Sequence, residues 1–411
     1  MSNKVRVVVT GLGCVSPLGQ DYDTTWKNLI SGKSGAKPIT HFDASDIATK
    51  FCCPVVDYDI SSFIDAKEAR RNDPFIIHGI CAAVQAIHES QLVADEISCH
   101  RIGVSIGSGI GGINFIEASH SLIESKSYRK ITPFFIPGSI TNMISGNISI
   151  RFNFKGPSFS IVSACTTGTH NIGNAMRLIQ CGDADAMVVG GSECASTKLG
   201  IVGFGNARAL STRNDDPLTA SRPFDVDRDG FVMGDGAAVI VIESLEFAQR
   251  RGAKILAELV GYGTSSDAYH ITSPSENGEG PIRCMKNALI DAKITPEEIN
   301  YINAHGTSTP AGDVIESKAI GSIFPSSIQV SSTKSMTGHL LGASGSIEAI
   351  FCILATINNI IPPTINVFNQ DPDCKIDCVP NKARASEISY ALSNSFGFGG
   401  TNGSLIFKKF T

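Results

Sequence analysis

The sequence predicts an α/β layered sandwich built from two similar halves. Short apolar segments rich in β-branched residues alternate with helical segments along the 411 residues, as they do in α/β domains. Two local patterns also recur. A Gly-Phe pair followed by a glycine at the same offset occurs at 230–236 and 397–403, and a strand leads into a glycine-rich helix at Cys165 and again at Lys334. These matches indicate an internal duplication, with halves expected at 1–253 and 254–411.

The predicted elements follow in a regular order. In the first half they are a strand at 5–10, a helix at 65–91, a strand at 102–107, a helix at 141–150, a strand at 159–164, a helix through 172–179, a strand at 184–190 and a hairpin at 230–242. In the second half they are a strand at 256–261, a helix at 281–292, strands at 301–304 and 328–332, a glycine-rich helix start within 337–354 and a hairpin with an apolar strand at 397–407.

Two glycine-rich segments raise the possibility of nucleotide binding. Residues 11–16 form half of a dinucleotide fingerprint, but the segment ends in Ser16 and no acidic residue closes a second strand at the expected distance. Residues 107–112 are not followed by Gly-Lys-Ser or Gly-Lys-Thr, the usual phosphate-binding continuation. We therefore expect a tight turn at the first segment and a plain loop at the second.

Composition excludes several classes of protein. A content of 42% apolar and 18% charged residues is typical of a globular protein with a large core. The net charge of −5 argues against nucleic-acid binding, and no apolar run approaches the ~20 residues of a membrane span. The N-terminus lacks a signal-peptide core, and the twelve cysteines are scattered, with Cys374 and Cys378 as a single loose pair. We expect a cytoplasmic protein with reduced thiols and no structural zinc.

Cys165 is the first candidate catalytic residue. It joins a short strand to a glycine-rich helix, where unpaired N–H groups and the helix dipole favour a thiolate. A buried structural cysteine is the alternative. Gly168 and Gly173 each cost a helix about 1 kcal/mol against alanine, which suggests that another backbone or a ligand comes very close there.

Two further segments carry reactive residues at predicted strand ends, where the sites of α/β sheets collect. They are 303–309, which contains His305, and 334–339, which contains His339. Neutral histidines can donate N–H bonds to an oxygen that gains negative charge, and a helix start beside His339 would help to keep that ring neutral. Backbone N–H groups at Cys165 and in the loop 396–400 can form an oxyanion hole for a bound acyl group.

A set of ordered motifs extends over essentially the whole chain. They are SACTTGTHNIG, GGSECASTKLGIVGFGNARALSTRNDDP, SRPFDVDRDGFVMGDGA, NAHGTSTPAGD, STKSMTGHLLGASGSIEA and NSFGFGGTNGSLIFKK. With these motifs the chain resembles the condensing enzymes of the thiolase superfamily, specifically the type II β-ketoacyl-acyl-carrier-protein synthases. The resemblance implies a five-layered α-β-α-β-α fold, a homodimer and no metal or organic cofactor. It also implies acyl transfer onto Cys165, then decarboxylation of malonyl-acyl-carrier protein and extension of the chain by two carbons.

The resemblance also implies roles for individual residues. His305 and His339 would stabilise the malonyl thioester oxygen, and the N–H groups of Cys165 and Phe398 would hold the acyl oxyanion. The supporting assignments are Lys334 paired with Glu348 for electrostatic tuning, Thr307 and Thr309 on the phosphopantetheine arm, Phe398 as a gate, and Ile110 and Phe204 lining the acyl pocket. For carrier-protein docking we expect a basic set, Lys67, Arg70, Arg71 and Arg208, because carrier proteins are acidic. The alternative for that set is a solvated helix face with internal pairing to Glu68.

Other functions fit the sequence less well. A thiolase would need a second cysteine in the last glycine-rich loop, and residues 394–403 contain none. A type III or chalcone-synthase-like enzyme would pair its cysteine with one histidine and an asparagine, and a silent chain-length factor would not need Cys165 with both histidines. Nothing in the chain resembles the nucleophile motif of a cysteine protease.

Overall fold

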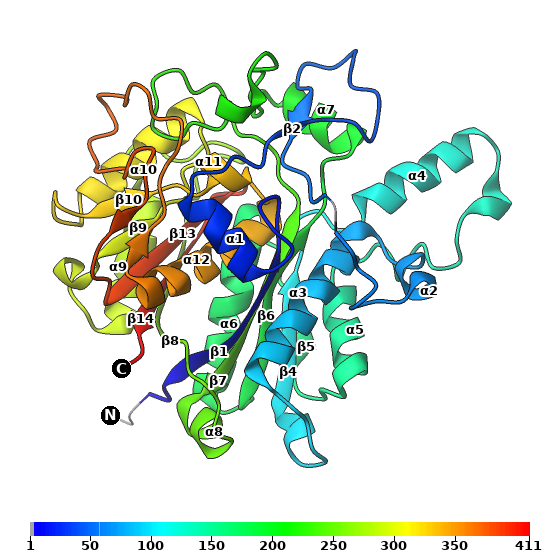
Figure 1. The fold of residues 1–411 in the computed structure, drawn as a ribbon, viewed down its shortest axis with the longest axis horizontal. Coiled ribbons are helices and arrows are strands. Elements are labelled where there is room, and N and C mark those ends of the chain that lie inside the picture. The colour runs from blue at the N-terminus through cyan, green and yellow to red at the C-terminus, as the bar shows by residue number, and fades with distance from the viewer. Residues whose placement is uncertain (1–3, 57) are drawn as a thin grey trace.

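A long twisted sheet forms the frame of the molecule (Figure 1). The computed structural model describes residues 4–56 and 58–411. Within these residues, ten strands form one sheet in the order β10-β9-β13-β14-β8-β1-β7-β6-β4-β5, with two separate two-stranded ribbons. Five strands come from each half of the chain, and the two halves of the sheet meet edge to edge where β1 pairs antiparallel with β8.

The strands have the following bounds. In the first half they are β1 (Val7–Val15), β4 (Ile102–Gly107), β5 (Ser158–Phe159), β6 (Ala186–Glu193) and β7 (Gly236–Ser244). In the second half they are β8 (Ala257–Ser266), β9 (Tyr301–Asn303), β10 (Gln329–Ser331), β13 (Tyr390–Gly397) and β14 (Thr401–Lys409). The ribbons pair β2 (Lys37–Pro38) with β3 (Phe51–Cys52), and β11 (Ile360–Ile361) with β12 (Arg384–Ala385).

The helices cover both faces of the sheet. They are α1 (Tyr22–Ile30), α2 (Ala66–Ala69), α3 (Pro74–Ser90), α4 (Ile113–Glu124), α5 (Met143–Phe152), α6 (Thr167–Cys181), α7 (Lys198–Asn206), α8 (Leu245–Arg250), α9 (Glu279–Ala292), α10 (Pro310–Gly321), α11 (Lys334–Thr337) and α12 (Ser344–Asn358). Short 3-10 turns add η1 (Ser98–Arg101), η2 (Tyr128–Lys130), η3 (Ala164–Thr166), η4 (Pro217–Thr219), η5 (Pro296–Glu298) and η6 (Leu341–Ala343).

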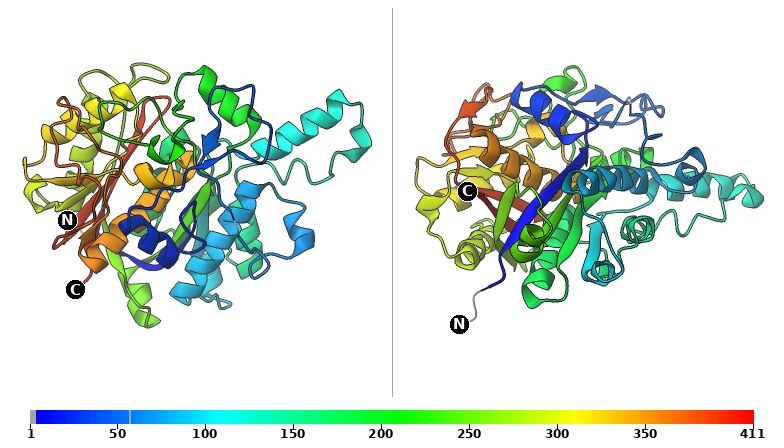
Figure 2. Two further views of the ribbon diagram at one scale, coloured as in Figure 1. Left: turned by 45° about the horizontal axis from the view of Figure 1, so that its top comes forward. Right: turned by 60° about the horizontal axis from the view of Figure 1, so that its bottom comes forward.

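The layers follow the predicted order α-β-α-β-α. Helix α3 packs on β1, β6 and β7, helix α9 packs on β8 and β14, and α6 and α12 pack against each other between the two halves of the sheet. The two further views in Figure 2 show the same layers, with α4 extending away from the body as an arm. The buried core runs through these layers and includes Ile172 and Met176 on α6 and Ile347 and Phe351 on α12.

Strand pairing confirms the predicted duplication. In the first half β4 is parallel to β5 and β6, and β7 is antiparallel to β6 and β1. In the second half β9 is parallel to β10 and β13, and β14 is antiparallel to β13 and β8. The β1–β7 pair and the β8–β14 pair each contain a shift in register. The shifts lie at matching places, between Val9 and Gly11 on β1 and between Ile406 and Phe407 on β14. The predicted boundary at 253/254 falls between α8 and β8 and stays a prediction.

Both sequence matches that suggested the duplication are, however, out of register. Gly236 lies opposite Glu193 in the β6–β7 pair, as Thr401 lies opposite Gly397 in the β13–β14 pair. Gly236 therefore corresponds to Thr401 and not to Gly403. Helix α6 corresponds to α12, whose preceding turn η6 matches η3, so the counterpart of Cys165 is Gly342, while Lys334 lies on the separate short helix α11.

Three local predictions are wrong for identifiable reasons. Residues 11–16 lie mostly within β1 and form no turn, because Gly11 and Gly13 let the strand approach α3: a Cβ at either position would lie 2.1 Å from a backbone carbonyl oxygen of that helix. The helix predicted at 65–91 is split into α2 and α3, since Asp73 caps a new helix that begins at Pro74. Residues 230–235 do not form a hairpin arm with β7, which instead pairs with β1 and β6.

The central helices explain the two glycines beside Cys165. A Cβ on Gly168 would lie 2.7 Å from the Ser346 backbone nitrogen, so close approach of another backbone is confirmed there. Gly173 packs instead against the ring of Tyr262, whose nearest carbon would lie 2.3 Å from a Cβ added at that position. In the described residues, Leu341–Asn358 is the one helical stretch long and apolar enough to cross a membrane, and 89% of it is buried in the protein interior.

Candidate active site

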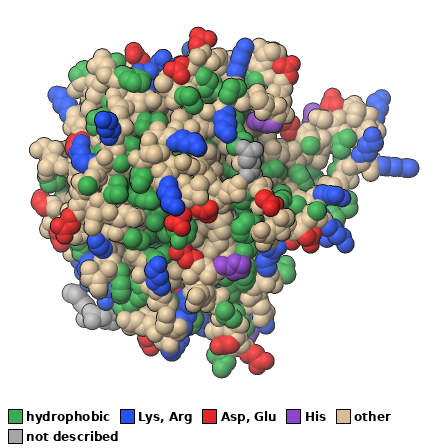
Figure 3. All heavy atoms as spheres, in the orientation of Figure 1, with side chains coloured by type: hydrophobic (Ala, Val, Ile, Leu, Met, Phe, Trp, Pro, Cys, Tyr) green, Lys and Arg blue, Asp and Glu red, His purple; other side chains and the backbone are tan. Residues whose placement is uncertain are grey.

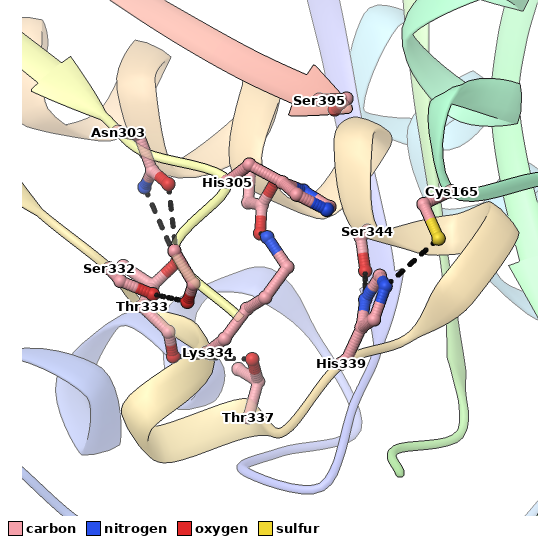
Figure 4. Close-up of polar contacts among 12 residues, drawn as sticks. Cys165, Asn303, His305, Ser332, Thr333, Lys334, Thr337, His339, Ser344 and Ser395 are labelled. Carbon is pink, nitrogen blue, oxygen red and sulfur yellow. Dashed lines mark hydrogen bonds and ion pairs between the residues drawn. The ribbon is translucent and has the colours of Figure 1, made fainter. Parts of the chain in front are cut away.

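Cys165, His305 and His339 come together in one buried cluster (Figure 4). Cys165 lies in η3 at the start of α6, His305 follows β9, and His339 lies between α11 and η6. The Nε2 atom of His339 is 3.0 Å from the Sγ atom of Cys165, and the centroids of the two imidazole rings are 5.3 Å apart. The three residues predicted to act together therefore share one site.

A backbone elbow delivers the cysteine to this cluster. Ala164 has a φ of 50°, in the left-handed region that non-glycine residues rarely adopt. The chain turns sharply there, before the first turn of α6. Leu341, at the matching position of the second half, has a φ of 47°, so both halves carry the same elbow. Backbone strain of this kind is common at functional sites.

The cluster lies on a cavity of about 610 Å³. Its lining includes Cys165, both histidines and several other predicted residues, namely Thr307, Thr309, Phe204, Phe398 and Arg208. The Thr307 and Thr309 hydroxyl oxygens are 3.0 Å apart, and the rings of Phe204 and Phe398 are in contact. Ile110 does not line this cavity: its side chain is 40% exposed and its backbone N–H donates to Glu193, so its predicted place on the acyl pocket is not observed.

The thiol of Cys165 is protonated at rest. Burial raises its pKa to about 12, although Lys334 and the backbone N–H groups of Phe398 and Cys165 act in the opposite direction. The N–H groups expected to favour a thiolate do lower the pKa of Cys165, but they do not offset the effect of burial. Desolvation of the charged form outweighs the dipole here, because the cluster is enclosed by the central layers of the fold.

Both imidazoles are neutral, as expected, but for a different reason. Burial and then the Lys334 ammonium lower the pKa of His305 and of His339 well below the ordinary value. The helix start predicted beside His339 is that of α12, whose first residue, Ser344, contacts the ring, but burial and Lys334 are the causes of the lowered pKa. A neutral imidazole carries one N–H and one acceptor nitrogen, so each ring can donate one hydrogen bond into the cavity.

The predicted Lys334–Glu348 pair is present and buried. The Lys334 ammonium donates to Glu348 Oε1, and both side chains are at most 2% exposed. Burial raises the pKa of Glu348, whereas the ammonium lowers it. Figure 4 shows Lys334 beside His305 and His339, where its charge favours anions and disfavours imidazolium.

The oxyanion donors predicted at Cys165 and Phe398 face the sulfur. The N–H groups of both residues interact with the Cys165 thiol and favour its charged form. Phe398 is held there by the β13–β14 hairpin, in which Gly399 and Gly400 adopt φ values of 85° and 72°. Glycine adopts these φ values without steric cost, so this turn can close the hairpin and present that N–H group.

Sequence reasoning missed two carboxylates that build the site. Glu316, on α10, accepts hydrogen bonds from the backbone N–H groups of His305 and Gly306 and so fixes the histidine loop. Glu193, at the end of β6, accepts from Gly109, Ile110 and Gly342 and ties the loop 107–112 to the second elbow. The loop N–H groups that resembled a phosphate cradle are thus occupied by a carboxylate. Both glutamates lie inside the recognised motifs or just beyond them, but nothing local marks them as buried.

The predicted docking residues have different environments. Lys67 and Arg70 are exposed at α2. Arg71 is half-buried with its guanidinium 4.4 Å from the ring centroid of Phe134. Glu68 pairs with Arg151 rather than with the three basic residues. Arg208 is exposed at the cavity.

The cluster also has the donor atoms of a soft-metal site. The ligand atoms of Cys165, His305 and His339 all lie within 4.8 Å of one another, and sulfur with imidazole nitrogen is the donor set that zinc prefers. The buried Lys334 ammonium beside them opposes a dication electrostatically. None of the twelve cysteines, all of which lie in the described ranges, forms a disulfide.

Known proteins share both the sequence and the fold. The family model of the β-ketoacyl synthase N-terminal domain matches residues 4–248, and that of the C-terminal domain matches residues 256–368. The chain is 55% identical over 411 residues to the 3-oxoacyl-[acyl-carrier-protein] synthase 2 of Vibrio harveyi, with 99% of each chain covered.

Two solved structures show the same fold at lower identity. A β-ketoacyl synthase from Burkholderia phymatum STM815 superposes with a TM-score of 0.92 and 36% identity, covering 99% of this chain and 100% of the other. A type II polyketide synthase ketosynthase in complex with its acyl-carrier protein gives a TM-score of 0.91 and 32% identity over 100% of both chains. This chain therefore belongs to the β-ketoacyl synthase family.

Proposed function

We propose that this protein is a type II β-ketoacyl-acyl-carrier-protein synthase that extends fatty acyl chains by two carbons. The observation that carries the proposal is the cluster itself. One thiol, two neutral imidazoles and two backbone N–H donors converge on a single cavity. Full-length similarity to relatives named 3-oxoacyl-[acyl-carrier-protein] synthase 2 supports the same activity.

The first step is transfer of an acyl group to Cys165. The sulfur attacks the carbonyl carbon of an acyl thioester, and the bond from that carbon to the carrier's sulfur breaks. The proton lost by Cys165 is matched by one gained by the departing carrier thiol. During attack the carbonyl oxygen becomes negative, and the N–H groups of Cys165 and Phe398 stabilise it. Because the resting thiol has a pKa of about 12, deprotonation has to accompany attack.

The second step is decarboxylation and condensation. The malonyl thioester binds with its carbonyl oxygen at His305 and His339, which donate N–H bonds as negative charge develops. The bond to the carboxylate breaks, carbon dioxide leaves, and the electron pair forms an enolate. The enolate carbon attacks the acyl group on Cys165, and the cysteine sulfur leaves as the thiolate, which takes up one proton from water to restore the resting thiol. Lys334 stabilises the anionic states, and Glu348 holds the ammonium in place.

The carrier arm reaches this site through the cavity. Thr307 and Thr309 present hydroxyl groups along its wall, and we assign them to the amide groups of the phosphopantetheine arm. Phe398, at 39% exposure and in contact with Phe204, serves as the gate on the acyl side.

Carrier protein docks on basic side chains. We assign Lys67, Arg70 and Arg208 to this surface, and Arg71 to a smaller role because its guanidinium already stacks on Phe134. In Figure 3 further Lys and Arg side chains gather on the arm that carries α4, on the same side of the molecule as α2. Docking of an acidic carrier would be sensitive to salt, since exposed charges are screened.

A homodimer is supported by an open sheet edge and by individually exposed apolar side chains. Strand β5 ends the ten-stranded sheet of the described residues, so one of its edges is unpaired. The exposed side chains Val162, Ile116, Ile136 and Ile140 follow it or lie on the arm. Exposed strand edges and apolar patches favour association. We expect light scattering to give twice the chain mass of 43.4 kDa, and Val162→Asp to shift the protein toward monomer.

We place the enzyme in the cytoplasm, because all twelve of its cysteines are free thiols and a reducing compartment keeps them so.

The activity is tested with purified enzyme and acyl- and malonyl-carrier protein across chain lengths. Carbon dioxide release should match formation of β-ketoacyl product one to one. Cys165→Ala should abolish chain extension together with covalent acyl labelling, followed by intact mass. An acylated Cys165→Ala protein would refute the nucleophile assignment, and labelling without any extension by the native enzyme would refute the condensing activity.

A further inference from the structure

Ser344 contacts the imidazole that faces the nucleophile. Its Oγ atom is 2.8 Å from the Nδ1 atom of His339, on the opposite side of the ring from the Nε2 atom that faces Cys165. Figure 4 shows both contacts of the ring. Ser344 and His339 are 1% and 2% exposed, so solvent does not compete for this hydrogen bond.

The contact permits two arrangements, and burial selects between them. Either the Ser344 hydroxyl donates to Nδ1, or Nδ1–H donates to the hydroxyl oxygen. In the part of the chain that the structure describes, the hydroxyl has no other hydrogen-bond partner. If Nδ1 were the donor, the buried hydroxyl proton would have no acceptor, which carries the full desolvation penalty of that group. Donation from Ser344 satisfies both groups.

We propose that Ser344 is a positioning residue that sets the tautomer of His339, leaving its single proton on Nε2. His339 then presents an N–H, and not a lone pair, to the Cys165 sulfur and to a thioester oxygen beside it. This inference rests on the proposed role of His339 as a donor to the forming enolate. It explains how a neutral imidazole serves as donor in every turnover without rearranging.

The other histidine lacks such a partner. His305 Nδ1 is buried and, among the described residues, has no hydrogen-bond partner. Its tautomer is therefore not set by the protein. The two imidazoles of the site are thus not equivalent: His339 is held as a donor, and His305 can exchange between tautomers.

Comparison of the two halves shows that Ser344 does not make the hydrogen bond made by its counterpart in the first half. The corresponding residue is Thr167, which begins α6 two residues after Cys165, as Ser344 begins α12 two residues after Gly342. Thr167 Oγ1 accepts a hydrogen bond from the Ser163 backbone N–H and so stabilises its own elbow. Ser344 makes no such bond and contacts the histidine instead.

The test compares Ser344→Ala with Ser346→Ala. Ser346 lies on the same helix, is equally buried, and donates to the Ala343 carbonyl without touching His339. In Ser344→Ala we expect the rate constant for decarboxylation of malonyl-carrier protein to fall about fivefold to tenfold, as for loss of one hydrogen bond. The KM should be unchanged, because Ser344 does not line the cavity. Ser344→Thr, which keeps the hydroxyl, should restore most of the rate.

A spectroscopic readout tests the tautomer directly. The chain has nine histidines, so selective ¹⁵N-histidine labelling gives a small set of ring signals, and the His339→Gln variant identifies those of His339. We expect a protonated Nε2 in the native enzyme and in Ser346→Ala, and a mixture of tautomers in Ser344→Ala.

An unchanged Nε2–H tautomer in Ser344→Ala would overturn the proposal, as would an equal loss of rate in Ser346→Ala. If the native enzyme failed to decarboxylate malonyl-carrier protein, the proposed function would fail, and the ring signals would still decide the role of Ser344.

Discussion

Gly345 at the crossing of α6 and α12 should be intolerant of a single methyl group. A Cβ at this position would lie 2.1 Å from Thr169 Oγ1, 2.8 Å from Ser395 Oγ and 2.9 Å from the Thr169 backbone nitrogen. Ordinary contacts between heavy atoms are about 3.5–4.0 Å. The neighbouring backbone cannot rotate away as a flexible side chain could, so the helices themselves have to move apart.

The magnitude follows from two opposing terms. Alanine is favoured over glycine in a helix by about 1 kcal/mol, and overpacking of a tight core costs about 3 kcal/mol at the upper end of its usual range. Gly345→Ala should therefore lower the free energy of unfolding by about 2 kcal/mol. Gly203 provides the matched control: it lies inside α7, and a Cβ there would meet nothing within 4 Å. Gly203→Ala should raise the free energy of unfolding by about 0.5–1 kcal/mol.

Moving α6 and α12 apart should also lower the catalytic rate. Ser344 and the loop of His339 precede Gly345, and Cys165 precedes the facing helix. A misplacement of about 1 Å between reacting groups can lower the rate on the order of 100-fold. Urea unfolding at a fixed protein concentration and steady-state extension rates measure the two effects. Equal stability and equal activity of Gly345→Ala and Gly203→Ala would refute the reasoning.

Three other predictions concern the site and its surface. Replacing His305 or His339 by alanine should impair decarboxylation while acyl transfer to Cys165 is partly retained; equal loss of both steps would count against the assigned roles. Because burial raises the pKa of the Cys165 thiol to about 12, its alkylation by iodoacetamide should keep rising about tenfold per pH unit up to pH 10, and a plateau near about pH 8.5, as for a free cysteine, would contradict this. Reversing Lys67 and Arg70 to glutamate should raise KM for carrier-bound substrate at low salt and leave the unfolding transition unchanged, and an unchanged KM would exclude that surface from docking.

Local sequence was sufficient to identify the reactive residues of the site. Cys165, His305, His339 and Lys334 each lie in a short motif with a glycine-rich turn beside it, and the order of those motifs indicates the family. The layers and the duplication also follow from sequence, since alternating strands and helices constrain an α/β fold strongly. These features depend on residues near one another in the chain.

The sequence did not predict which residues of the two halves correspond, because a strand can shift by two residues without changing which face its side chains occupy. The pairing of Gly236 with Glu193 and of Thr401 with Gly397 is decided by the whole sheet. For the same reason Gly11 and Gly13 resembled a turn: nothing in β1 itself reveals that α3 presses against it.

The sequence alone determined which reactive groups this protein has and roughly which strand ends carry them. The tertiary structure decided their protonation. Segments that are far apart in the chain pack around the site and bury it, which keeps the Cys165 thiol protonated and both imidazoles neutral. The Ser344 hydroxyl orients the proton of His339. Desolvation and hydrogen-bond geometry depend on everything packed around a titratable side chain. A sequence motif can therefore identify a nucleophile without determining its protonation state.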